Sequence, residues 1–198
     1  MALGDERRAA GVTMRAIAAR LGVEAMSLYN HVAGRDDLID GMVDAVFREI
    51  ELPAPGADWK AAMRGRAASA RAALRRHPWA VGLLDSRDQP GPATLRHHDA
   101  VLGALRTGGF SVAMAAHAFS LIDSYLYGFV LQELSLPFTD RAGFDEVAGG
   151  ILDGLPSGDY PHLAELISEH ALKPDYDHAA EFAFGLTLIL DSLHPDER

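Results

Sequence analysis

Cysteine is absent from the 198 residues, which excludes disulfide bridges, thiolate metal sites and a cysteine nucleophile. The first eleven residues, MALGDERRAAG, lack the apolar core of a secretory signal, so a cytoplasmic protein is expected. Runs of β-branched residues typical of strands are also missing. Hydrophobic residues make up 48% and charged residues 23%, which is an ordinary balance for a globular chain. The sequence therefore predicts a soluble protein without strands.

The common catalytic and metal-binding motifs are missing as well. The sequence has no Glu-x-x-His, no His-Glu-x-x-His, no Gly-x-Ser-x-Gly and no Walker-type phosphate loop. His97, His98 and Asp99 are consecutive, but consecutive residues of a helix point about 100° apart and do not readily share one ion. We expect no enzyme, no metal and no other cofactor; a helical enzyme or metal protein is the alternative from another class.

Positive charge is scarce, since the net charge is −10, and this disfavours nucleic acid as a partner of the whole chain. The distribution is uneven, however. Residues 13–35 carry three Arg and one Glu, whereas the acidic excess lies mainly after residue 50. Nucleic-acid binding is therefore expected only at this small basic island near the front of the chain.

Apolar residues recur at helical spacing through most of the chain, which predicts an all-α fold. Thr13 is a good N-cap and Gly22 a good helix stop. The Pro-rich segment 52–57 predicts a boundary between two domains, residues 1–50 and 58–198. Helices are expected at 14–21, 25–32, 36–50, 58–76, 92–107, 110–136, 161–172 and 175–193. The Gly- and Asp-rich segment 138–160 is expected to be mostly loop, with one helical turn.

The segment 110–131 is apolar enough to resemble a membrane span, although it contains Asp123 and His117. No basic cluster flanks it, so we expect it to be buried in protein, without a membrane partner. An isolated buried charge is costly, so Asp123 needs a partner, a ligand or a proton. Ligand contact and structural pairing both stay open for Asp123.

Four basic residues follow one face of the helix predicted at 58–76, namely Lys60, Arg64, Arg71 and Arg75. No acidic residue lies between them. This stripe is either a solvated face or a site for an anionic ligand or a second phosphate contact.

A helix-turn-helix is predicted at residues 13–32, because a three-residue turn separates two short helices. By itself this spacing is weak evidence, since many small bundles contain it. The residues are more specific: TMRAIAARLGVE at 13–24, MSLYNHV at 26–32 and RDDL at 35–38 resemble the DNA-binding domain of the TetR family. Asp58-Trp59, His77-Pro78-Trp79, Gly109-Phe110-Ser111 and residues 184–190 resemble the C-terminal domain of its Tet repressor branch.

The resemblance implies an N-terminal helix-turn-helix DNA-binding domain and a C-terminal helical domain for ligand binding and dimerisation. It also implies a homodimeric repressor that a small-molecule inducer releases from a palindromic operator. Only 12 residues precede Thr13, so the first helix of the domain is expected to be truncated. The alternative is therefore a helical ligand-binding or adaptor protein that has lost DNA binding.

Site residues follow from the same resemblance. The residues expected at DNA are Thr13, Arg15, Ala25, Met26, Ser27, Tyr29, Asn30, His31 and Arg35. The residues expected at the ligand are Arg66, Trp79, Leu84, His117, Asp123 and Tyr127. The residues expected at the dimer interface are Phe119, Leu126, Phe182, Leu186, Ile189, Leu190 and Leu193.

The resemblance also argues against one ligand. Leu84 stands where the branch has its metal-binding His, and Gln132 stands at its acidic position. A magnesium–tetracycline chelate would therefore lack its anchors here, and another, largely apolar small molecule is expected.

Overall fold

The computed structural model describes residues 1–84 and 86–196 and, among these, not the side chains of residues 7–9. This part of the chain contains ten α-helices and no strand, which confirms the predicted all-α fold. The helices are α1 (Ala2–Gly11), α2 (Met14–Leu21), α3 (Ala25–Leu28), α4 (Arg35–Glu49), α5 (Trp59–Arg76), α6 (Pro92–Thr107), α7 (Val112–Ser135), α8 (Arg141–Gly154), α9 (Pro161–Leu166) and α10 (His178–Ser192). A 3-10 turn, η1 (Pro78–Ala80), follows α5, and a π-helical turn, η2 (Ile167–Ala171), follows α9.

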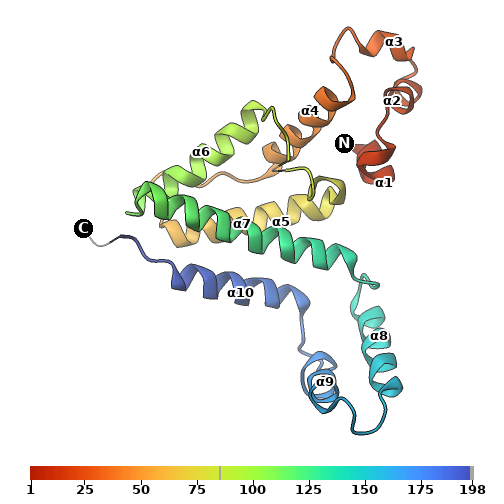
Figure 1. The fold of residues 1–198 in the computed structure, drawn as a ribbon, viewed down its shortest axis with the longest axis vertical. Coiled ribbons are helices and arrows are strands. Elements are labelled where there is room, and N and C mark those ends of the chain that lie inside the picture. The colour runs from red at the N-terminus through yellow and green to blue at the C-terminus, as the bar shows by residue number, and fades with distance from the viewer. Residues whose placement is uncertain (85, 197–198) are drawn as a thin grey trace.

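The helices are arranged in three parts (Figure 1). Helices α1–α3 gather at one end, and α4 leads from them to the body. The body consists of α5, α6, α7 and α10, with α10 beside α7. Helices α8 and α9 project from the far end of α7, and we call residues 138–177 the arm.

One continuous hydrophobic core joins α4 to the body. Val46 of α4 lies in the same buried cluster as Met63 of α5, Leu105 of α6 and Ile122 of α7, and all four are 0% exposed. The predicted domain boundary at residues 52–57 therefore separates segments of sequence that still share a core through α4. We expect movement of α4 to displace α5 and α6, because tightly packed interiors transmit displacement.

Helix α10 approaches α7 closely. The Tyr125 hydroxyl of α7 lies 3.1 Å from the carbonyl oxygens of both Glu181 and Phe182 and donates to them. A Cβ on Gly185 would clash with this hydroxyl, so glycine is required there for the two helices to reach this distance.

The expectation of mostly loop for residues 138–160 is wrong, because α8 occupies fourteen of these positions. Asp140 caps the helix by accepting a hydrogen bond from the backbone N–H of Gly143 at 2.9 Å. Phe144 then stacks on Tyr176, with ring centroids 5.1 Å apart. Capping and this tertiary contact outweigh the glycines that lower the helix propensity of the segment.

Helix α7 is long and apolar enough to cross a membrane by length and composition, and about a third of that stretch is buried within the single chain. Core helices of soluble proteins have the same properties. Six of its residues, including Asp123, are buried against the neighbouring helices. We therefore describe α7 as a core helix of the body.

Candidate DNA-binding surface and effector site

The helix-turn-helix forms where the sequence predicts it. The Thr13 hydroxyl accepts a hydrogen bond from the backbone N–H of Ala16 at 3.2 Å and so caps α2. Gly22 ends α2 with φ 68°, a left-handed conformation that favours glycine. Regular helix in α3 ends at Leu28, four residues earlier than predicted, and residues 29–31 continue as turns.

Most side chains predicted to contact DNA face solvent. Met26 is 73% exposed and Tyr29 50% exposed. Arg15, Asn30 and His31 are exposed as well, whereas Ala25 and Ser27 are half-buried. The structure thus places a mixed apolar and polar surface on α3 and the turn after it, with Arg15 on the preceding helix.

Two residues predicted to contact DNA also hold the domain together. The Ser27 hydroxyl donates to the carbonyl oxygen of Glu24 at 2.7 Å. Nε of Arg35 donates to the carbonyl oxygen of Val12 at 2.9 Å, which fixes the start of α4 against the turn between α1 and α2. Any contact of Arg35 with DNA would therefore be made by a guanidinium that is already oriented.

Charged side chains connect α4 to the body. Asp44 is 2% exposed, and its Oδ1 accepts hydrogen bonds from the backbone N–H groups of Ala93 and Thr94 at 2.8 and 2.9 Å. Burial alone would raise the pKa of Asp44, but hydrogen bonds from Thr94, Arg48 and Ala93 outweigh it and lower the pKa. The N-cap residue of α6 is Gly91, which has no side chain to cap the helix. A carboxylate of α4 caps the first turn of α6 instead.

A second connection involves the last turn of α5 and the residue after it. His77 lies between two carboxylates: Nδ1 is 2.7 Å from Asp5 of α1, and Nε2 is 3.0 Å from Glu49 of α4. Arg76 also donates to Glu49, at 2.8 Å. Hydrogen bonds from Arg76 and His77 lower the pKa of Glu49, and burial only partly opposes them. The end of α5 is therefore in contact with both α1 and α4.

A buried polar network occupies the centre of the body. Arg66 of α5 is 2% exposed and forms a two-pronged ion pair with Asp123 of α7, in which Nη2 lies 3.0 Å from Oδ2. Nε of Arg66 donates to Nε2 of His97 at 3.0 Å, and the Tyr127 hydroxyl donates to Asp123 at 3.3 Å. Asp123 is therefore structurally paired, one of the two roles that the sequence left open.

The network affects the pKa values of Arg66 and His97. Burial would lower the pKa of Arg66, but its pairing with Asp123 outweighs burial and raises it. Burial, with a contribution from the Arg66 charge, lowers the pKa of His97 to about 3. His97 is therefore a neutral hydrogen-bond acceptor at neutral pH.

The six residues predicted to bind the ligand do not surround one cavity. Arg66, Asp123 and Tyr127 contact one another, but Trp79 donates from Nε1 to Asp5 at 2.7 Å and His117 is exposed. Leu84 is 3% exposed and lines a cavity of about 120 Å³ between α4 and α6. A ligand would have to break the buried pair to use Arg66 or Asp123.

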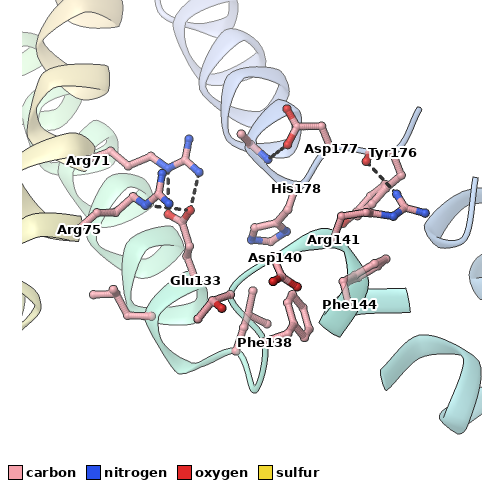
Figure 2. Close-up of a pocket in the computed structure, with 14 residues that line it drawn as sticks. Arg71, Arg75, Glu133, Phe138, Asp140, Arg141, Phe144, Tyr176, Asp177 and His178 are labelled. Carbon is pink, nitrogen blue, oxygen red and sulfur yellow. Dashed lines mark hydrogen bonds and ion pairs between the residues drawn. The ribbon is translucent and has the colours of Figure 1, made fainter. Parts of the chain in front are cut away.

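A larger cavity, of about 510 Å³, lies where the arm meets the body (Figure 2). Arg71 and Arg75 of α5 and Glu133 of α7 line one side. Phe138, Phe144 and Tyr176 of the arm and His178 of α10 line the other. The arm residues are not predicted as a site from the sequence, because residues 138–160 are expected to be mostly loop. The available signal is Asp140, a helix cap placed before Phe144.

The basic stripe on α5 has acidic neighbours in the folded chain, so it is not a plain solvated face. Lys60 pairs with Asp191 at 2.8 Å, and Arg71 pairs with Glu133 at 2.6 Å. Both acids come from helices distant in sequence, so helical spacing alone did not reveal them.

The structure places most of the predicted dimer residues in the core of the single chain. Five of them are buried within the single chain and therefore belong to its own core, namely Leu126, Phe182, Leu186, Leu190 and Leu193. Phe119 and Ile189 are half-buried against the same core. The helical stripe was identified correctly as apolar, but it packs α10 against α7 within one chain.

The comparisons with known proteins agree with this fold. A family profile described as "Tetracyclin repressor-like, C-terminal domain" matches residues 52–195. The chain is 36% identical to the transcriptional repressor DrrR1 of Streptomyces coeruleorubidus, over 96% of this chain and 73% of that one. It is 30% identical to the class A tetracycline repressor of transposon 1721 from Escherichia coli, over 92% and 81%.

Solved structures of TetR family proteins superpose well on this fold. The TetR family protein ActR of Streptomyces coelicolor, in complex with actinorhodin, superposes with a TM-score of 0.79 at 27% identity, over 97% of this chain and 90% of that one. ActR in complex with (S)-DNPA gives a TM-score of 0.78 at 26% identity, over 97% and 91%. These relatives are regulators of transcription and not enzymes. The chain therefore belongs to the TetR family of ligand-responsive, DNA-binding transcriptional repressors.

Proposed function

We propose that the protein binds a palindromic operator as a homodimer in the cytoplasm and leaves it when a small molecule binds to the body. The observation that carries this proposal is the solvent-facing surface of Met26, Tyr29, Asn30 and His31, which lies within the basic segment 13–35 of an acidic chain. A short helix of this kind fits the major groove of DNA. An adaptor that had lost DNA binding would have no need of such a surface.

Roles at DNA follow from side-chain chemistry. Asn30 and Ser27 offer hydrogen bonds to base edges, Met26 and Ala25 offer apolar contact to a thymine methyl, and Tyr29 and His31 suit phosphates. Arg15 and Arg35 add charge for phosphates, and Thr13 can add its hydroxyl beside its role as a cap.

The homodimer is proposed to form through the faces of α7 and α10 that the single chain leaves exposed. Phe184 and Leu188 of α10 are 64% and 57% exposed, and Leu121 and Leu131 of α7 are 44% and 59% exposed. Leu121 and Leu131 lie on one side of α7 with Ser124 and Gly128, small residues that permit close approach of a second helix pair. Four such helices would form a bundle.

The experiment is selection of binding sites from a pool of random duplex DNA with the full chain. A palindrome with half-sites about one helical turn apart supports the proposal. Failure to retain any duplex at low salt contradicts it, because phosphate contacts alone should give measurable binding there. Binding that enriches no sequence contradicts it as well.

A further inference from the structure

The cavity between body and arm is built from aromatic rings on one side. Phe138 meets Phe144 edge to face at 5.1 Å, and Phe144 stacks on Tyr176 at 5.1 Å. His178 stacks on Phe129 at 5.0 Å, and its Nε2 is buried with no hydrogen-bond partner among the described residues. The wall therefore offers flat apolar contact and one unused polar atom, which together suit a planar ring that carries a polar group.

The opposite side carries positive charge that is only partly neutralised. Arg71 takes both oxygens of Glu133, at 2.9 and 2.6 Å. Arg75 reaches the same carboxylate only at 3.6 Å, and its side chain is 58% exposed. Arg71 and Arg75 thus pair with the same carboxylate, and the ion pair of Arg75 is the weaker of the two.

The other acids of the cavity are engaged elsewhere. Asp140 and Asp177 each accept a hydrogen bond from a helix N-terminus, at Gly143 and Ala179 respectively. The partial positive charge of these helix ends offsets both carboxylates. Arg141, the third cation of the lining, has Asp145 at 2.8 Å and donates to the carbonyl oxygen of Tyr176. Arg75 is therefore the cation best placed to accept an anionic group of a ligand.

We propose that this cavity binds an aromatic anion, with the rings against Phe144 and Tyr176 and the acidic group on Arg75. The site is separate from the buried network of Arg66 and Asp123. A volume of about 510 Å³ is within the range for small-molecule sites. A regulatory role of this site rests on the proposed function. It follows because the residues after Arg75 are Arg76 and His77, which contact Glu49 and Asp5. Displacement of Arg75 by a ligand acts on the turn that holds α1 and α4.

The first experiment measures binding alone. The full chain is titrated calorimetrically with 1-hydroxy-2-naphthoate and with uncharged 1-naphthol, which differs from it only by the carboxylate. We expect one naphthoate per chain and a Kd for Arg75→Gln that is about 10- to 100-fold weaker, the loss of a charge-assisted hydrogen bond. Arg64→Gln is the control, since Arg64 is an exposed residue of the same helix that does not line the cavity. It should bind as the wild type does.

Three results would overturn the proposal: no heat of binding at millimolar naphthoate, equal binding by both variants, or equal affinity for 1-naphthol. The second experiment adds the probe to the protein on its selected operator. Release by naphthoate from the wild type but not from Arg75→Gln supports the regulatory step. Binding without release overturns that step and leaves the ligand site standing. Failure of the protein to bind any DNA contradicts the proposed function and leaves the calorimetric result unaffected.

Discussion

Arg66 and Asp123 hold α5 and α7 together at the centre of the body, with side chains that are 1% and 9% exposed. Removal of one partner leaves an uncompensated buried charge, which costs far more than the pair contributes. We expect Arg66→Met to lower the free energy of unfolding by about 3–5 kcal/mol. The double variant Arg66→Met with Asp123→Leu should regain most of that loss. Urea unfolding checks both, and a single variant within about 1 kcal/mol of the wild type would refute this role.

His97 should make stability depend on pH. Its pKa is about 3 in the folded chain and about 6.5 when unfolded, so only the unfolded state takes up a proton between these values. Stability therefore falls as the pH is lowered from about 6.5 towards 3, by up to about 1.4 kcal/mol per pH unit from this group. His97→Gln keeps an acceptor for Arg66 and should reduce the slope, whereas His162→Gln, at a 97% exposed side chain, should not. Equal slopes in urea unfolding would contradict the account.

At the scale of elements, α4 and α6 are joined by Asp44 acting as the cap of α6. Asp44→Ala should cost about 1–2 kcal/mol, as loss of an N-cap does. It should also speed hydrogen exchange at the amides of Ala93 and Thr94, which lose their acceptor. Asp140→Ala removes the cap of α8 and serves as control, since it should leave these two amides protected. Unchanged exchange at Ala93 and Thr94 in Asp44→Ala would show that α6 is capped by another group.

The same elements show how far the sequence could predict the structure. The body helices follow from apolar spacing, and α2 follows from the cap Thr13 and the stop Gly22. Helix α8 could not be predicted in the same way, because its stability depends on the contact of Phe144 with Tyr176, 32 positions later. The cap of α6 could not be predicted from the local sequence either, because Asp44 lies on another helix and Gly91 has no side chain.

The candidate site was predicted in part for a similar reason. The proposed recognition surface is a local pattern in residues 25–31, so a resemblance in sequence is enough to predict it. The large cavity is made of residues from α5, α7, the arm and α10, and its walls meet only in the folded chain. Most of the predicted dimer stripe lies in the core of the single chain, because an apolar helix face predicts burial but does not tell which helix covers it.

At the scale of the whole molecule, the dimer surface can now be tested at exposed positions. Leu188→Asp places a charge on the proposed interface while leaving the monomer core intact, so it should convert a dimer to a folded monomer at micromolar concentration. Ile189→Asp would instead disturb the core against which Ile189 packs. Leu95→Asp, at a 55% exposed residue of α6, is the matched control and should stay dimeric. A Leu188→Asp dimer in sedimentation equilibrium would exclude this interface.

The central claim is that this chain reads DNA through α3 and the turn that follows it. The most direct test is a salt titration of binding to the selected palindrome and to a scrambled duplex, for the wild type, Asn30→Ala and Arg15→Ala. We predict that the wild type prefers the palindrome by about 10³-fold or more. Arg15→Ala should weaken binding to both duplexes alike and reduce the dependence of log K on log salt by about 0.9 per phosphate contact. Asn30→Ala should lose about 1–3 kcal/mol of preference at one position per half-site. Equal binding of the wild type to both duplexes, or an unchanged preference in Asn30→Ala, would contradict the claim.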